Sequence, residues 1–476
     1  MRKLKLSVLF FLLTSFYCFG QQAKYVFYFI GDGMGPAHVA TTEAYLAATE
    51  DEIGFQKLSF TNFPATGFAT TYAENRLITG SAAAGTALAA GQKTTINTIG
   101  MNADRSKNFK SIAEEARDNG FKVGIISSVS IDHATPASFY AHQPTRSMYY
   151  EISLDLPKSG FDFFGGGGFA DPYKDNSVST SVFEIAGLSG YTITSTRATF
   201  DSLQPGHGKI IAMGTKLESS GALPYAIDQN DADIPLEEFV DKAIAILDNE
   251  NGFFIVCEEG KIDWAAHAND GASVIQNVIS LSMSVEEALE FYYQHPDETL
   301  IVVTADHETG GLSMGSSRMK YDSDLKLLGK QKISFQNFSY LVDSVLVKKG
   351  EDKPTFEFVM GLVDAYFGLG GTNGSPLSEE ELEIFYQAYL HSIGEVSSLN
   401  GINYGGYNPI AVTTTDILNQ RAGIGWNSYS HTALPVPVFA IGVGHEMFNG
   451  YYDNTDIPKK IAEIMGMQNW SSGELK

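Results

Sequence analysis

The sequence predicts an α/β protein built on a mainly parallel β-sheet. Short apolar runs rich in β-branched and aromatic residues alternate with stretches of helical periodicity, and this alternation is typical of parallel strands joined by helices. Of the 476 residues, 43% are hydrophobic, 18% are charged and 47 are glycine, which fits a globular sheet protein with many tight turns. The sequence shows no internal repeat and no low-complexity tract.

Five apolar runs are expected to form strands of this sheet. They occupy residues 24–30, 122–129, 253–257, 300–304 and 436–442. Helix-like stretches at 111–119 and 235–248 lie between them, and a helix of small residues is expected from Ser81 to Gly91. This order of strands and helices favours a parallel arrangement.

The N-terminus is expected to be a signal peptide spanning residues 1–20. Three basic residues precede a short apolar stretch, and Gly20 is a small residue suited to cleavage. The apolar stretch, Leu6–Phe19, is too short for a confident membrane span. Cys18 lacks the small residue that precedes a lipidated cysteine, so a lipoprotein is not expected. The mature protein, residues 21–476, is therefore expected in the periplasm or outside the cell, without a membrane anchor.

The chain is strongly acidic, with a formal net charge of -24 and an isoelectric point of about 4.7. This charge argues against nucleic acid as a specific partner, because no basic stripe exists to contact phosphates. An anionic substrate would need local positive charge, such as metal ions or an arginine. Cys257 is the one cysteine left in the mature chain, so no intramolecular disulfide is expected, and its apolar run FFIVC predicts a small core residue.

Residues 312–425 depart from the alternating pattern and are expected to form a helical insertion on the sheet. Lys320–Lys332 is largely polar, and helix-like segments follow at Phe335–Lys349 and Glu379–Ile393. The segment SPLSEEE, which begins at Ser375, is typical of a helix start with acidic residues in the first turn. The alternative is that these helices belong to the main core.

The first candidate site residues, Asp306 and His307, directly follow the run at 300–304. Open α/β sheets bind ligands at the carboxyl ends of their strands. A carboxylate oxygen beside an imidazole nitrogen at such an end suits a zinc-type ion. The alternative is a turn carboxylate with a surface histidine, but similar arrangements recur along the chain.

Asp32 and Ser81 are two further candidates. Asp32 follows the first predicted strand in IGDGMG, where glycines on both sides allow a sharp turn. Ser81 opens the helix SAAAGTALAAG and is either an N-cap or a nucleophile. A helix N-terminus carries positive potential and free N–H groups that favour phosphate. A metal that lowered the pKa of the hydroxyl would let it attack phosphorus.

Glu258, Asp263, His267 and His431 complete the candidate metal ligands. Glu258 and Asp263 flank the end of a predicted strand. Asp263 and His267 are four residues apart, so a helix would place both on one side. His431 precedes the last predicted strand and could be a third protein ligand. Arg146 could hold phosphate oxygens in a bidentate manner.

Taken together, these segments resemble the alkaline phosphatase family. The chain has the family's DG turn, SA-initiated helix, ATP-A segment (HATPASFYAH), E-x-x-x-I-D-x-x-x-H element, DHETGG and final H-T-A in family order, from Asp32 to His431. The resemblance implies a three-layer sandwich around the sheet. It also implies an enzyme that hydrolyses small phosphate monoesters through a phosphoserine, with two zinc ions and one magnesium ion, and the family is often dimeric.

The resemblance also assigns roles to the candidate residues. The ligands of the first zinc would be Asp263, His267 and His431. Those of the second, beside the nucleophile Ser81, would be Asp32, Asp306 and His307. Those of magnesium would be Asp32, Thr135 and Glu258. Arg146 matches the arginine that grips phosphate.

Four residues depart from the common family pattern. Gly80 replaces the aspartate that commonly precedes the nucleophile and orients the arginine, so Arg146 is expected to be more mobile. His133 and Trp264, expected near the substrate, stand where some members have an aspartate and a lysine close to magnesium. They indicate a His/Trp subgroup, in which a secondary metal near His133 is an option. Glu259 stands where the family usually has glycine, and it is either a supporting residue or without a role.

Two other classes of function stay open. Diesterases of the superfamily commonly use a threonine nucleophile and lack the magnesium site, whereas Thr135 and Glu258 favour a monoesterase. Sulfatases need an arginine after the nucleophile that SAAAG does not contain. Outside enzymes, a periplasmic protein that binds metal or phosphate would use similar ligands but would not need a hydroxyl beside them.

Overall fold

A computed structural model describes residues 22–173, 181–315, 319–346, 353–371, 374–396, 406–467 and 470. The expected signal peptide, residues 1–20, lies outside these ranges. Within them, no helix combines the length and the apolar character needed to cross a bilayer.

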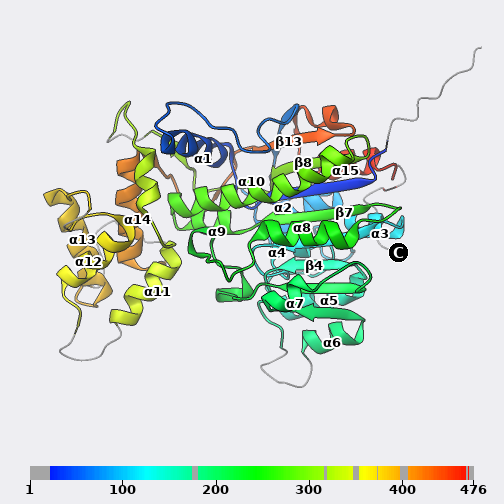
Figure 1. Ribbon diagram of the computed structural model, residues 1–476, viewed down its shortest axis with the longest axis horizontal. Helices are drawn as coiled ribbons and strands as arrows, with labels where there is room; N and C mark the ends of the chain where they lie inside the picture. Colours follow the sequence, from blue (N-terminus) through cyan, green and yellow to red (C-terminus); the bar gives the residue numbers. More distant parts are fainter. Residues whose placement is uncertain are drawn as a thin grey trace, which may run out of the picture.

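A ten-stranded sheet forms the centre of the described structure (Figure 1). Its strands lie in the order β14 (Gly450–Asp453), β2 (Ala65–Thr70), β13 (Val436–Gly442), β8 (Thr299–Ala305), β1 (Tyr25–Gly31), β7 (Phe253–Glu259), β3 (Lys122–Ser127), β4 (Phe163–Gly166), β6 (Lys209–Met213) and β5 (Tyr191–Thr194). The neighbouring strands are parallel, except that β13 runs antiparallel to both β2 and β8. The predicted α/β fold with a mainly parallel sheet is confirmed.

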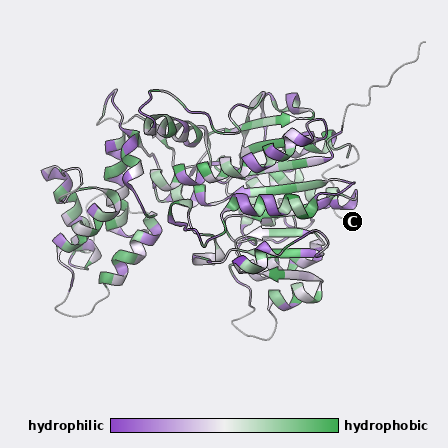
Figure 2. Cartoon of the chain, in the orientation of Figure 1, coloured by the Kyte–Doolittle hydropathy of each residue, from purple (hydrophilic) through white to green (hydrophobic). Residues whose placement is uncertain are grey.

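The five predicted strands correspond to β1, β3, β7, β8 and β13. Strands β1, β7 and β8 are buried at every position, because they lie in the middle of the sheet with both faces covered. They therefore appear in the sequence as continuous apolar runs, and the centre of the sheet is strongly hydrophobic in Figure 2. Strand prediction missed β2, β4, β5, β6 and β14, which are short or alternate between buried and exposed residues.

Helices cover both faces of the sheet (Figure 1). On one face, α8 (Leu236–Leu247) and α10 (Gly271–Gln294) pack together over the central strands, and α1 (Pro36–Thr49) and α9 (Lys261–His267) adjoin α10. On the other face lie α2 (Ser81–Ala90), α3 (Ile112–Asp118) and α4 (Ala134–Ala137), with α15 (Asp456–Ile464) against α2. The helices between β3 and β6 are α5 (Tyr149–Ser159), α6 (Val182–Leu188) and α7 (Arg197–Asp201).

Four helices lie to one side of the sheet instead of on its faces, at the left of Figure 1. They are α11 (Phe335–Leu346), α12 (Phe356–Phe367), α13 (Glu379–Ser392) and α14 (Pro409–Ala422). Buried residues such as Phe338 and Leu418 give them a hydrophobic core of their own, which extends to Ile275 on α10. Helix α13 starts at a capping box between Ser378 and Glu381, as the SPLSEEE sequence predicts.

Two short antiparallel pairings join the chain before these helices to the chain after them. Strand β9 (Glu308–Thr309) pairs with β12 (His431–Thr432), and β10 (Ser313–Met314) pairs with β11 (Ile424–Gly425). The first pairing brings the segment that carries His307 beside the segment that carries His431.

Candidate active site

The carboxyl ends of the central parallel strands place three acidic residues at one edge of the sheet. Gly31, the last residue of β1, is level with both Glu259 of β7 and Ala305 of β8. The next residues along β1 and β8 are Asp32 and Asp306, so both carboxylates lie beside Glu258, and all three side chains are fully buried. Three carboxylates in a dry interior repel one another and lose hydration, so they need cations or protons nearby.

A glycine allows the Asp32 turn to approach α9. Gly33 has a positive φ of 73°, and a Cβ at this position would lie 2.9 Å from Cα of Asp263. Any larger residue would be strained and would push the turn away from α9. The IGDGMG sequence therefore brings a strand-end carboxylate close to the helix that carries Asp263 and His267.

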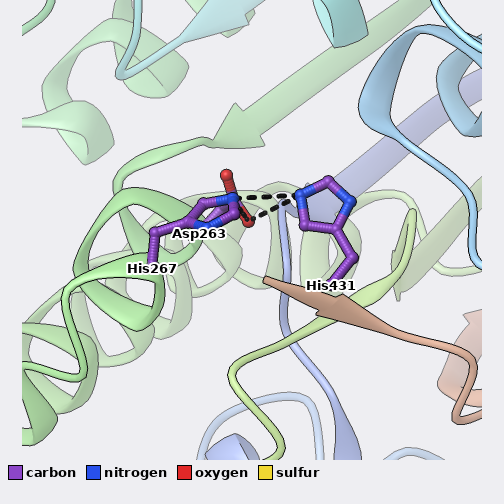
Figure 3. Close-up of side chains that lie close together, drawn as sticks. All are labelled: Asp263, His267 and His431. Atoms are coloured by element: carbon purple, nitrogen blue, oxygen red, sulfur yellow. Dashed lines mark hydrogen bonds and ion pairs between the residues drawn. The ribbon is translucent and has the colours of Figure 1, made fainter. Parts of the chain in front are cut away.

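The first group of candidate ligands is Asp263, His267 and His431 (Figure 3). Nε2 of His267 lies 3.4 Å from Oδ1 of Asp263 and 3.0 Å from Nε2 of His431. The opposite ring nitrogens face main-chain carbonyls, with Nδ1 of His267 2.7 Å from the Tyr429 oxygen and Nδ1 of His431 2.9 Å from the Thr79 oxygen. Each Nδ1–H therefore donates to a carbonyl, and both bare Nε2 atoms point at one place, as in histidine-rich metal sites.

The charge balance of this group matches a cation site. Burial by itself would raise the pKa of the Asp263 carboxyl, but His267, His431 and His307 outweigh burial and lower it. The pKa of His431 is lowered, chiefly by burial. The group therefore offers one carboxylate and the Nε2 atoms of two imidazoles, a donor set that suits zinc.

The second group is Asp32, Asp306 and His307. Nε2 of His307 lies 3.4 Å from Oδ1 of Asp32 and 3.3 Å from Oδ2 of Asp306. Asp306 uses its other oxygen, Oδ1, to accept from the backbone N–H groups of Gly33 and His307. Both oxygens of Asp32 and Oδ2 of Asp306 are buried without a hydrogen-bond partner. Buried oxygens of this kind are expected where a cation completes the site.

The third group is Glu258 with Thr135, and it shares Asp32 with the second group. Ligand atoms of Asp32, Glu258 and His133 lie within 4.8 Å of one another. Oε2 of Glu258 accepts from the Ser127 hydroxyl, whereas Oε1 of Glu258 and Oγ1 of Thr135 are buried without a partner. Burial raises the pKa of Glu258 to about 8, despite the Ser127 hydrogen bond. The oxygen donors of this group suit magnesium, and the imidazole of His133 adds a nitrogen donor beside them.

Ser81 lies beside the second group. It is the first residue of α2, and the N-cap is Gly80, so the alternative that Ser81 caps the helix is wrong. Its Oγ lies 3.3 Å from Nε2 of His307 and 3.5 Å from Nη1 of Arg146. The first N–H groups of α2 have no partner within the helix, and Ser81 is the residue at which this helix begins. A phosphate at Ser81 would therefore meet backbone donors, a guanidinium and the ligand groups.

Arg146 has a partner that the sequence did not predict. Its Nη2 lies 2.8 Å from Nε2 of His133, and its backbone N–H donates to the Asn97 carbonyl at 2.8 Å. The ring of Trp264 meets the His133 ring edge to face, with centroids 5.9 Å apart. His133 therefore lies between Arg146 and the third ligand group, and Trp264 packs against it.

Sequence reasoning missed the role of Glu308 in the DHETGG turn. Its carboxylate accepts from the backbone N–H groups of Gly311 and Leu312 and from the hydroxyl of Thr432. Thr432 follows His431, and Glu308 follows His307. Glu308 thus fastens together two segments that each carry a candidate ligand. Its position inside the DHETGG motif was the available signal.

A second buried network behind α9 was also missed. Lys261 is fully buried, and its Nζ lies 3.4 Å from the carboxylate of Glu218 and 3.9 Å from the centroid of the Tyr225 ring. Glu218 also accepts from the side-chain amides of Gln336 and Asn337 on α11. This network joins α9 to the helices beside the sheet.

Glu259, the other departure at this strand end, is a buried supporting residue. It accepts from the hydroxyls of Ser128 at 2.6 Å and Ser280 at 3.0 Å. Its main-chain oxygen also accepts from the N–H of Asp32. Glu259 is therefore part of the packing that fixes the Asp32 turn.

Comparisons with known proteins agree with this geometry. A family model described as alkaline phosphatase matches residues 23–168 and 189–467. Alkaline phosphatase 4 of Bacillus subtilis is 30% identical over 453 residues, which cover 93% of this chain and 89% of that protein. The cold-active alkaline phosphatase of Shewanella sp. superposes with a TM-score of 0.77 at 28% identity, over 93% of this chain and 99% of that one. The alkaline phosphatase of Thermus thermophilus superposes with a TM-score of 0.77 at 25% identity, over 97% of this chain and 96% of that one.

Proposed function

This chain belongs to the alkaline phosphatase family and is a phosphatase, and we propose that it hydrolyses phosphate monoesters through a phosphoserine formed on Ser81. The observation that carries the proposal is the position of the Ser81 hydroxyl. It lies at a helix N-terminus, 3.3 Å from a histidine of the second ligand group and 3.5 Å from Arg146. No other hydroxyl of the motifs quoted above has all three neighbours.

The three ligand groups support two zinc ions and one magnesium ion. Zinc would be held by the two groups that contain histidine nitrogen. These are Asp263 with His267 and His431, and Asp32 with Asp306 and His307. The oxygen set of Asp32, Thr135 and Glu258 would hold magnesium, and its unpartnered buried oxygens fit that role. When bound, the zinc ions favour the ionised form of the attacking hydroxyl and neutralise charge on the leaving oxygen.

The protein side chains account for the remaining chemistry. Oγ of Ser81 gives its proton to solvent and attacks phosphorus, the ester P–O bond breaks, and the leaving alcohol oxygen takes a proton from solvent. Water then attacks the phosphoserine, the P–Oγ bond breaks, inorganic phosphate is released, and the proton lost by the attacking water restores the Ser81 hydroxyl. Arg146 and the free N–H groups at the start of α2 stabilise the non-bridging oxygens in both steps.

Hydrolysis of p-nitrophenyl phosphate, of its bis-ester and of p-nitrophenyl sulfate tests the proposal. We expect fast monoester hydrolysis that a chelator abolishes and that zinc with magnesium restores. Ser81→Ala should lose this activity and should still bind inorganic phosphate. Preference for the bis-ester would instead indicate a phosphodiesterase. Stoichiometric phosphate binding by an inactive, metal-loaded wild type would indicate a binding protein.

We also infer export and dimerisation from the sequence. The basic and apolar N-terminal residues support cleavage after residue 20 and a periplasmic or secreted enzyme without a membrane anchor. N-terminal sequencing of protein recovered outside the cytoplasm tests the cleavage. Light scattering of the purified protein tests the homodimer, and a monomeric mass at micromolar concentration would refute it.

A further inference from the structure

The guanidinium of Arg146 contacts a histidine, His133, and residue 80 before the nucleophile is a glycine that offers it no carboxylate. Gly80, directly before the nucleophile, has no side chain to offer. Among the described residues, the guanidinium contacts the side chains of Ser81, with Oγ at 3.5 Å, and of His133, with Nε2 at 2.8 Å. The shorter contact is therefore the main restraint on the guanidinium.

The chemistry of this contact makes His133 the acceptor. Arginine has only donors, so Nε2 of His133 must accept from Nη2 of Arg146. The ring is buried and is fixed by the edge of Trp264, whose indole also lies 4.9 Å from Nζ of Lys261. His133 is thus a fixed acceptor and not a mobile surface side chain.

We propose that His133 is the positioning residue for Arg146 and replaces the carboxylate that Gly80 does not provide. A neutral acceptor holds the guanidinium in place without cancelling its charge. The whole positive charge therefore stays available to the phosphate oxygens beside Ser81. This inference rests on the proposed function, because it concerns the same phosphate site.

The backbone at Gly80 makes the replacement testable. Gly80 has φ −134° and ψ 160°, an extended conformation that any residue adopts. A Cβ at this position would have no atom within 4 Å. An aspartate therefore fits at residue 80 without strain, on the helix end that carries Ser81. Residue 80 directly precedes Ser81, whose Oγ lies 3.5 Å from Nη1 of Arg146, so we expect a carboxylate at residue 80 to reach the guanidinium.

The experiment compares His133→Phe, His133→Phe with Gly80→Asp, and His133→Phe with Gly80→Ala. Phenylalanine keeps a ring against Trp264 and removes the acceptor. We expect His133→Phe to weaken binding of inorganic phosphate by roughly two- to tenfold, because ordering a long side chain costs about 0.5–1.5 kcal/mol. Phosphate binding is measured by calorimetry and as competitive inhibition of p-nitrophenyl phosphate hydrolysis, with the metal content of each variant determined in parallel.

The substitutions at Gly80 distinguish a loss of Arg146 positioning from general structural damage caused by His133→Phe. Gly80→Asp should restore most of the phosphate affinity in the His133→Phe background, and Gly80→Ala should restore none. Unchanged affinity in His133→Phe would overturn the inference, and so would a loss that Gly80→Asp fails to repair. A wild type that neither hydrolyses the monoester nor binds phosphate would instead refute the proposed function itself.

Discussion

Replacing Glu218 by glutamine should destabilise the protein at neutral pH more than an ordinary change of surface charge. The carboxylate is 5% exposed and faces the fully buried Nζ of Lys261 at 3.4 Å. Burial lowers the pKa of Lys261 to about 8, even though Glu218 attracts the ammonium group. Glutamine keeps the size of the side chain and one of the two oxygens that accept from amides of α11, but it removes the counter-charge and replaces the other oxygen by an N–H donor.

The magnitude follows from the protonation of Lys261. An unfolded lysine has a pKa of about 10.4, so the unfolded chain binds more protons between pH 8 and that value, and the free energy of unfolding rises with pH there. Without Glu218 the folded-state pKa falls further. The pH-dependent part of the loss at pH 7 has an upper limit of about 1.4 kcal/mol, because the folded-state pKa of about 8 in the wild type lies one unit above that pH. We expect a loss of about 1 kcal/mol at pH 7 and close to none at pH 10, where Lys261 is neutral in both folded proteins.

Urea unfolding of the metal-saturated protein at pH 7 and pH 10 measures this difference. Lys216→Met is a matched control, because Nζ of Lys216 lies 3.8 Å from the same carboxylate but the side chain is 52% exposed. It should change the free energy of unfolding by no more than about 0.5 kcal/mol. The double variant E218Q/K261M should regain most of the loss of E218Q. An equal loss at both pH values, or a loss no greater than that of Lys216→Met, would refute the reasoning.

Three further outcomes are expected. Glu308→Ala should loosen the pairing of β9 with β12 and weaken zinc retention about 10- to 100-fold in competition with a chelator, so unchanged retention would contradict the role of Glu308. Burial raises the pKa of Asp306 to about 7 and of Glu258 to about 8, so the folded apoprotein holds protons that the unfolded chain releases above pH 4. The melting temperature of chelated protein should therefore fall from pH 5 to pH 9, and that of metal-loaded protein should not follow it. Burial also raises the pKa of the Cys257 thiol, so a thiol reagent at pH 8 should label the urea-unfolded chain and not the native protein within minutes.

The strands that position the site could be predicted because burial on both faces leaves a continuous apolar run. Strands β1, β7 and β8 have this property, and Asp32, Glu258 and Asp306 could be placed by it at the ends of strands. Strand β14 has four residues with exposed positions, so its sequence resembles that of a loop. Helix α10 was missed because buried serines such as Ser280 and Ser284 interrupt its apolar pattern.

The convergence of the ligands was harder to predict than their identity. His431 reaches His267 through β9 and β12, a pairing of two residues on each side that no propensity rule detects. The partner of Arg146 was also beyond prediction, because His133 precedes it by 13 residues in an irregular segment. The sequence indicated greater mobility for Arg146 from Gly80 alone, whereas the structure gives it a different acceptor.

The pairing of β10 with β11 holds together the two ends of the segment that carries helices α11 to α14. The chain enters this segment after Ser313–Met314 and leaves it at Ile424–Gly425, and β9 and β12 pair next to these strands. Because this pairing already joins the two ends of the segment, a change in the length of the segment costs little additional loop-closure entropy. Longer loops between these helices should therefore leave His307 and His431 in register, whereas loss of α11 would remove the contacts of Gln336 and Asn337 with Glu218 and so would reach α9.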